Sequence, residues 1–219
     1  AAPIYEDNGR KAAHVGFSWS QRPANEDGTI RFRSRPNVHD APRFLNTDFI
    51  TDVDDFTALS AEAAVVRGPF SVQGEWMQNS VDRNNGADPD IDGFYVFGSY
   101  FLTGEHRPYD PDDGDFGRVD VNNEFIGFQD GNWGTLKKGP GAVEVAVRYS
   151  EADATEVIPA YTSNANLATE VTSITGGVNW YLNSHTRMMF NWVNADVEDG
   201  AFTGDPSSDW LTARFQVDF

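Results

Sequence analysis

Apolar and polar residues alternate along much of this chain, most plainly in residues 208–219. Apart from Trp210, the apolar residues of this segment occupy every second position: Leu211, Ala213, Phe215, Val217 and Phe219. The residues between them, such as Thr212 and Gln216, are polar. A period of two predicts a β-strand with one apolar face, and about ten residues is the length with which a tilted strand crosses a bilayer. We therefore expect a strand that ends on an aromatic residue.

The same alternation recurs in eight other segments. The candidate strands are residues 12–20, 44–51, 56–66, 70–80, 93–102, 141–151, 169–182 and 186–196. Segment 44–51 is the weakest, and the alanine-rich segment 56–66 also fits a short helix. Short turns at 67–69 and 183–185 join neighbouring segments into hairpins, which favours strands. The pattern therefore predicts an all-β protein with about nine antiparallel strands.

These strands fit a membrane barrel better than a helical membrane protein. No stretch reaches the roughly 18 to 20 consecutive apolar residues of a membrane helix, and the mean hydropathy is low. A transmembrane β-barrel keeps its average hydropathy low because lipid-facing and lumen-facing residues alternate. Nine strands do not close an antiparallel barrel, which needs an even number. Either residues 124–128 supply another strand, or residues 1–219 are a single outer-membrane β-barrel domain that forms the C-terminal part of a longer protein.

The connections between the predicted strands differ in length. The long ones are residues 82–92, 152–166 and 198–207, and they alternate with the short turns, as expected for long loops outside and tight turns inside a barrel. By this parity the 103–140 connection starts on the short-turn side, where so long a segment is unusual unless it folds into the lumen. The pattern leaves the side of residues 21–43 open.

Charge and composition narrow the function classes. The formal net charge is -18, with 16 Lys and Arg against 34 Asp and Glu, which argues against a nucleic-acid binder. Cysteine is absent, so we expect neither disulfides nor thiolate metal sites. His14, His39, His106 and His185 lack metal-ligand spacing. No nucleophile elbow or phosphate-binding glycine loop is present, so we expect neither an enzyme nor a cofactor.

Several motifs, in order along the chain, resemble the phosphate- and polyphosphate-selective porin family. They are residues 31–36, 68–75, 93–109, 143–150, 177–183, 187–191 and the ending 214–219. The resemblance implies the C-terminal half of a sixteen-stranded, usually homotrimeric barrel with a water-filled pore in the bacterial cell outer membrane. Its partners would be outer-membrane lipid and lipopolysaccharide, and its permeants small hydrophilic solutes or ions such as phosphate. Such barrels pass anions through a constriction built from inward-folded connections and basic side chains.

Anion transport requires cationic side chains that face the lumen. The strand register places Arg148, Arg187 and Arg214 there. The inward-folded connection would add Arg107, Arg118, Lys137 and Lys138, and a second cluster would consist of Arg31, Arg33 and Arg35. The alternative for each is a structural arginine paired with a carboxylate, for example Arg148 with Glu144. Because Glu62, Glu75, Glu144 and Asp218 share the same face, a general porin is the more conservative expectation.

Other functions remain open from sequence. Asp88, Asp90 and Asp92 match the opening of a calcium loop, but Ser99 stands where a bidentate Glu is required, so they are weak calcium candidates and a plain acidic loop is favoured. The same aromatic residues and acidic loops also suit a soluble β-sandwich or carbohydrate-binding module. A third alternative is a plugged barrel that serves as a structural outer-membrane anchor.

Overall fold

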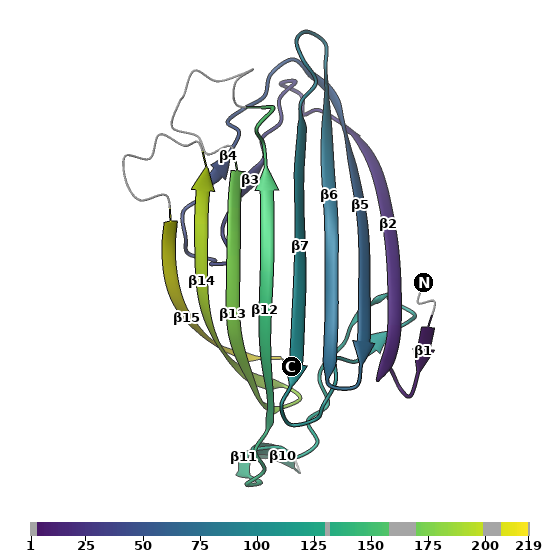
Figure 1. Cartoon of the computed structure of the whole chain (residues 1–219), viewed down its shortest axis with the longest axis vertical. Helices are drawn as coiled ribbons and strands as arrows, with labels where there is room; N and C mark the ends of the chain where they lie inside the picture. The colour runs from purple at the N-terminus through teal and green to yellow at the C-terminus, as the bar shows by residue number, and fades with distance from the viewer. Residues whose placement is uncertain (1–3, 130–131, 158–169, 199–206, 219) are drawn as a thin grey trace.

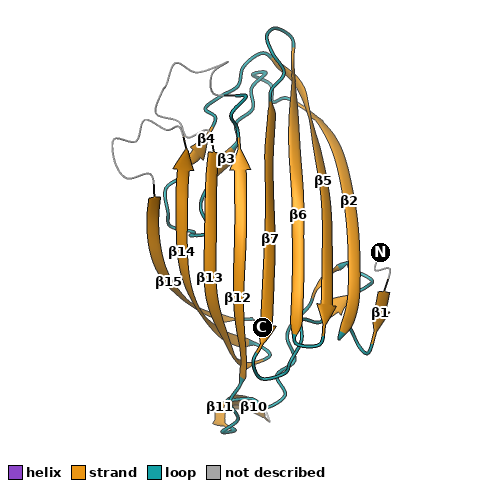
Figure 2. Cartoon of the chain, viewed as in Figure 1, coloured by secondary structure: helices purple, strands orange, loops and turns teal. Residues whose placement is uncertain are grey.

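The computed structural model describes residues 4–129, 132–157, 170–198 and 207–218, and its main feature is one curved antiparallel sheet (Figure 1, Figure 2). The nine strands of this sheet, in spatial order, are β1 (Ile4–Glu6), β2 (Lys11–Pro23), β5 (Val53–Arg67), β6 (Phe70–Arg83), β7 (Asp90–Phe101), β12 (Ala142–Asp153), β13 (Glu170–Asn183), β14 (Thr186–Glu198) and β15 (Ser207–Val217). Three separate hairpins are β3 (Arg33–Ser34) with β4 (Leu45–Asn46), β8 (Tyr109–Asp110) with β9 (Asp115–Phe116), and β10 (Ile126–Gln129) with β11 (Asn132–Leu136). Among the described residues, no helix is long and apolar enough to span a membrane.

The all-β prediction is confirmed, and so are eight of the nine predicted strands. The exception is segment 44–51, of which only Leu45–Asn46 is a strand, paired with Arg33–Ser34 outside the main sheet. Its apolar residues Leu45 and Ile50 are buried in a cluster with the sheet residues Val81 and Val171, so they attach a connection instead of forming a wall strand. Residues 124–128 add no strand to the main sheet either, because β10, which covers part of them, pairs with β11 in a separate hairpin.

The two faces of the sheet differ as the alternation predicts. We call the face that contacts the 24–52 and 102–125 connections the inner face, and the opposite one the outer face. Large apolar side chains stand exposed on the outer face, including Phe17 at 73%, Phe215 at 62% and Leu211 at 85%. Among the described residues, the nine-stranded sheet has an exposed apolar face with no second large sheet packed on it, which contradicts the packed sheets of a β-sandwich.

The connections sort to two ends of the sheet. The β5–β6 and β13–β14 turns lie at one end of the sheet. The connection between β7 and β12, whose residues 102–125 contact the inner face, starts at the same end, so the prediction that it begins on the short-turn side is confirmed. The 24–52 connection, whose side the sequence left open, lies at the other end with the 84–89 loop (Figure 1). The predicted loops 152–166 and 198–207 fall largely outside the described residues.

Small apolar clusters attach both long connections to the inner face. Val38 and Ala41 of the 24–52 connection pack with Val193 of β14, and Phe44 contacts Trp210 with ring centroids 5.6 Å apart. This inward contact explains why Trp210 breaks the polar side of the alternation in β15. At the other end, Tyr109 packs with Ala12 and Val66, while Val119 packs with Phe101 and Tyr181. The connections therefore line the inner side as fixed parts of the fold.

Candidate functional site

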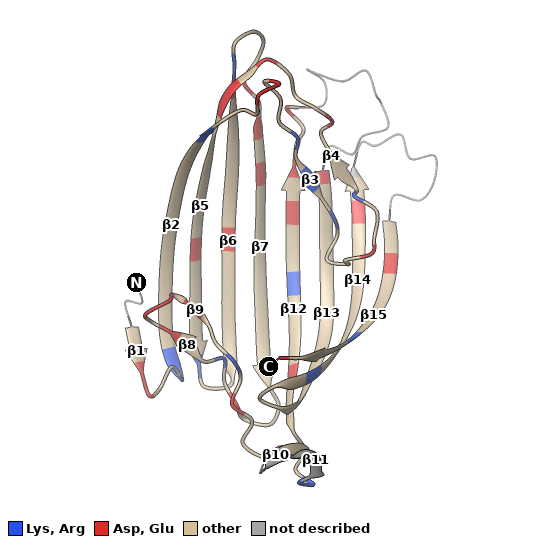
Figure 3. Cartoon of the chain, turned by 180° about the vertical axis from the view of Figure 1, so that it is seen from behind, with Lys and Arg blue, Asp and Glu red and all other residues tan. Residues whose placement is uncertain are grey.

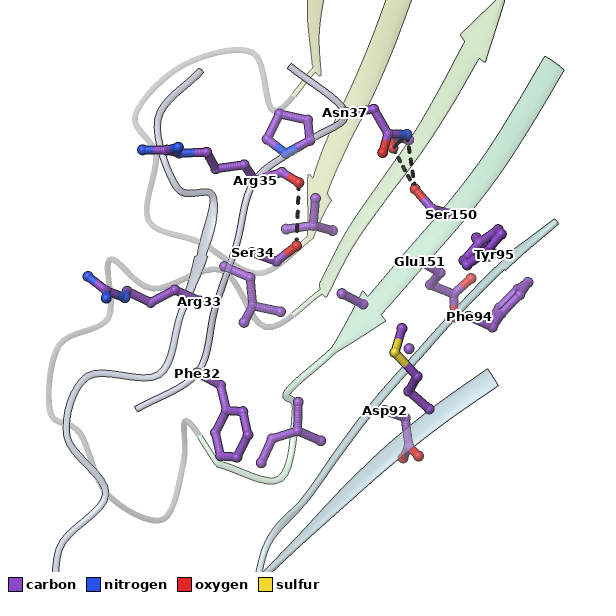
Figure 4. Close-up of a pocket in the computed structure, with 18 of the residues that line it drawn as sticks. Phe32, Arg33, Ser34, Arg35, Asn37, Asp92, Phe94, Tyr95, Ser150 and Glu151 are labelled. Carbon is purple, nitrogen blue, oxygen red and sulfur yellow. Dashed lines mark hydrogen bonds between the residues drawn. The ribbon is translucent and has the colours of Figure 1, made fainter. Parts of the chain in front are cut away.

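A pocket of about 380 Å³ lies between the 24–52 connection and the inner face (Figure 4). Asn37 holds the connection there, since its Nδ2 lies 3.3, 3.1 and 3.1 Å from the hydroxyl oxygens of Ser150, Ser173 and Thr175. Arg33 and Arg35 line the pocket, and their side chains extend away from the strands (Figure 4). The connection therefore presents guanidinium groups to the space beside the wall.

Four arginines of this connection form a basic cluster: Arg31, Arg33, Arg35 and Arg43. Arg31 is neutralised, because its Nη2 lies 3.5 Å from Asp48 Oδ1 and its Nε donates to Asn46. The positive charge of Arg33, then that of Arg35, lowers the pKa of Arg43. Arg43 was missed from sequence, although its place in the same connection as the three predicted arginines could have indicated it.

Arg148 lies on the inner face of β12, as the register predicts, and it does not pair with Glu144, the carboxylate of the structural alternative. Its guanidinium stacks over Tyr95 of β7, 3.9 Å from the ring centroid, and its buried Nε has no hydrogen-bond partner. Within the described parts of the chain, no Asp or Glu oxygen lies within ion-pair distance of Arg148. In the described structure the Arg148 guanidinium therefore stacks on an aromatic ring and forms no ion pair.

Glu144, the partner expected for Arg148, instead binds Arg107. Arg107 Nε donates to Glu144 Oε1 over 2.9 Å, and the fully buried carboxylate also accepts from Asn179 Nδ2 at 2.8 Å and Tyr181 Oη at 3.0 Å. Arg107 also stacks over Phe97, 4.7 Å from the centroid. Arg107 is thus a structural arginine paired with a carboxylate, and its ion pair attaches the 102–125 connection to β12.

A second basic pocket, of about 310 Å³, lies at the short-turn end. Arg107, Arg118 and Arg187 line it together with Asp218. Within the described structure, Arg187 donates only to a neutral acceptor, Gln216 Oε1, from Nε at 3.3 Å and Nη2 at 3.0 Å. Asp218 is the one carboxylate among the lining residues, so the pocket keeps an excess of positive charge.

The remaining predicted cations lie apart from the two pockets. Arg214 is exposed on β15, in register with Met189. Lys137 pairs with Glu124 over 2.7 Å, beside the β10–β11 hairpin, which projects beyond the end of the sheet (Figure 1). Lys138 is exposed next to it. The structure therefore does not bring these lysines together with the arginines of the inner face.

Besides Glu144 of β12, the inner face carries carboxylates on the paired strands β5 and β6. Glu62 of β5 and Glu75 of β6 are register partners. Glu62 Oε1 lies 3.1 Å from His14 Nε2, and His14 Nδ1 lies 2.7 Å from the Tyr109 hydroxyl. Burial raises the pKa of Tyr109, and the nearby Glu62 raises it further, so the protonated phenol is available to donate to His14.

The weak calcium candidates do not converge. Asp88 accepts from the backbone N–H of Arg83 at 2.9 Å, and Asp90 accepts from Gln78 at 3.3 Å. Asp92 lies in the pocket beside the 24–52 connection. Across the described ranges, no group of three or more His, Asp or Glu residues could hold a metal ion.

Comparison with known proteins agrees with this arrangement. The whole chain, residues 1–219, matches the family described as phosphate-selective porin O and P. Porin O of Pseudomonas aeruginosa is 28% identical over 170 residues, which cover 75% of this chain and 36% of that protein. An uncharacterized protein of Caulobacter vibrioides is 29% identical over 147 residues, 66% of this chain and 27% of that protein. This chain thus spans well under half the length of either relative. With its single sheet, apolar outer face and arginine-bearing inner face, the chain belongs to the phosphate-selective porin O and P family.

Proposed function

We propose that this chain forms part of the wall of a bacterial outer-membrane channel that passes small hydrophilic solutes, including anions such as phosphate. The observation that carries the proposal is the division of one sheet into an apolar outer face and a polar inner face with unpaired arginines. The eight long strands have 11 to 15 residues, enough to cross a bilayer when tilted. The family match supports a channel and not an enzyme.

The arginines offer a route for anions along the inner face. Arg33, Arg35 and Arg43 stand at the long-loop end, Arg148 on the strand β12, and Arg118 with Arg187 at the short-turn end. An anion that leaves water needs charge-assisted donors at each step, each weak enough to release it. Arginines spaced along the wall, with few carboxylate partners, meet both requirements.

A wider assembly is part of the proposal. The sheet is open, with β1 and β15 at its edges, and exposed edges within hydrocarbon would leave backbone groups unpaired. We propose that further strands close the barrel, that the outer face contacts outer-membrane lipid with lipopolysaccharide, and that three copies associate. Crosslinking of the full-length protein in native membranes tests the trimer, and a monomer alone would contradict it.

Conductance tests the channel directly. The full-length protein is reconstituted in planar bilayers, and the reversal potential is measured in asymmetric KCl and potassium phosphate. We expect stable conductance with an anion preference that falls in the triple variant Arg33→Gln, Arg35→Gln, Arg43→Gln. The matched control, Lys137→Gln with Lys138→Gln, removes charge beyond the sheet and should leave the preference unchanged. A folded protein without conductance would instead support the plugged-barrel anchor, for which the inward position of the 102–125 connection is the favouring observation.

A further inference from the structure

We propose that the inner face separates charge sideways, with an acidic patch of Glu62 and Glu75 beside the cation Arg148, and that this arrangement favours small zwitterionic solutes. The solute class is one that carries an ammonium group and, a few bonds away, a carboxylate or phosphate. This inference rests on the proposed channel function and deepens it, because a wall with cations alone would favour simple anions.

The acidic patch consists of two carboxylates placed side by side. Glu62 and Glu75 are direct register partners of β5 and β6, an arrangement of like charges that destabilises a sheet. Neither forms an ion pair with a Lys or Arg in the described ranges, and the one charged-group contact of Glu62 is with His14. The repulsion is partly relieved because Glu62 lies over Gly16, where an added Cβ would be 2.5 Å from its Oε1. The two carboxylates therefore lie together on this part of the wall with no Lys or Arg partner among the described residues.

Arg148 stands one strand away from this patch. Tyr95 of β7 is the register partner of Glu75 and also the ring on which Arg148 stacks. Adjacent strands lie about 4.8 Å apart, so β6 and β12, with β7 between them, are separated by about 10 Å. The tyrosine ring holds the guanidinium on the β12 side, and Arg148 and Glu75 do not meet as an ion pair.

The separation is visible across the middle of the sheet. Figure 3 shows acidic bands on β5 and β6 and, at a comparable height, a basic band on β12, with acidic bands above and below it on the same strand. Glu144, near the start of β12, is paired with Arg107. The net result is a negative side at β5–β6 and a positive side at β12, where Arg33 and Arg35 of the 24–52 connection line the adjoining pocket.

Such a wall acts on solutes according to their charge distribution. A simple anion is attracted by Arg148 and repelled by Glu62 with Glu75, whereas a neutral solute senses little of either. A zwitterion can orient its ammonium group toward the carboxylates and its anionic group toward the guanidinium, so both contacts are favourable. One unit charge on a partly solvated wall changes the rate at which a charged solute passes by about two- to five-fold.

The test compares three solutes of nearly equal size in liposomes that contain the full-length protein. They are the zwitterion β-alanine, the neutral 3-hydroxypropionamide and the anion 3-hydroxypropionate, and the readout is the rate of entry of each. We expect β-alanine to enter about two- to five-fold faster than the neutral solute. In the double variant Glu62→Gln with Glu75→Gln, the ratio of β-alanine entry to neutral-solute entry should fall to about one, and the anion should enter faster. In Arg148→Gln the same ratio should fall to about one, but the anion should enter more slowly.

A matched control removes the same charge elsewhere. Glu26→Gln with Asp27→Asn neutralises two exposed acids of the 24–52 connection and should leave the ratio of zwitterion to neutral solute unchanged. Heat-modified migration in gels verifies that each variant is folded. An unchanged ratio in Glu62→Gln with Glu75→Gln would overturn the inference while the channel stands. Failure of all three solutes to enter through wild-type protein would overturn the channel itself.

Discussion

Arg107 and Glu144 form an ion pair of 2.9 Å that joins the 102–125 connection to the inner face of β12. The Glu144 carboxylate is fully buried, and Asn179 and Tyr181 complete its hydrogen bonds. A buried carboxylate with its acceptor sites occupied stabilises the attached segment only while the guanidinium is present, because an unpaired buried charge is costly. This pair is thus a polar link that keeps the connection on the wall.

Glu144→Ala should destabilise the fold by about 2–4 kcal/mol, because it leaves the partly buried Arg107 without its counter-charge. Urea unfolding in detergent micelles measures this cost. The matched control is Glu124→Ala, which breaks the exposed pair with Lys137 and should cost about 0–1 kcal/mol. Equal costs for the two variants would contradict the assigned role of Glu144.

Gly141→Ala should also destabilise the protein, at the point where the long connection enters β12. Gly141 has φ +73, and an added Cβ would lie 2.5 Å from Tyr181 O, so the substitution combines backbone strain with a clash. We expect a loss of about 1–3 kcal/mol in the same unfolding assay. Gly176→Ala, which meets only Trp192 at 3.9 Å, serves as the control and should be close to neutral.

Phe190→Arg and Asn191→Arg place the same charge on opposite faces of β14. Phe190 is exposed on the outer face, so an arginine there enters lipid and should cost about 2–4 kcal/mol near the bilayer midplane. Asn191 lies on the inner face beside Gly177, where water can solvate the new charge. Folding into lipid vesicles under urea measures both variants, and a larger loss for Asn191→Arg would reverse the assignment of the faces.

Arg148→Gln should lower the ratio of anion to cation permeability by about two- to five-fold, because it removes an unpaired charge from the wall. Arg148→Lys keeps the charge and should retain most of the ratio, although the planar stacking on Tyr95 is lost. Reversal potentials in salt gradients distinguish the two. If both variants behaved like wild type, Arg148 would be a structural residue only.

The alternation was sufficient to predict eight of the nine strands of the main sheet and their faces, whereas the three-residue edge strand β1 was missed. A period of two is readable wherever one face is apolar along a whole strand, as in 141–151, where Val145 and Val147 alternate with Ala146 and Arg148. The prediction was wrong for 44–51 because Leu45 and Ile50 are apolar for another reason, the attachment of a connection to the sheet. Alternation alone does not distinguish these two uses of apolar residues.

The contact partners of the predicted arginines could not be predicted from the sequence as well as the strands could. All ten predicted cations are described, but the pairing of Glu144 with Arg107 instead of Arg148 depends on the path of a connection that has no periodic pattern. Tyr95, on which Arg148 stacks, belongs to a strand distant in sequence, and only the β7–β12 register brings the two together. Residue type and strand parity indicate which side chains share a face, while their contacts require the fold.

The central claim is that the outer face contacts lipid and the inner face contacts water. The 219 residues contain no cysteine, so single cysteines can be introduced along β12 without background from this chain. We expect a charged, water-soluble thiol reagent to label cysteines at 146, 148 and 150, and spin-labelled lipid to quench fluorophores attached at 145, 147 and 149. Labelling in the opposite alternation, or uniform labelling at all six positions, would contradict the account.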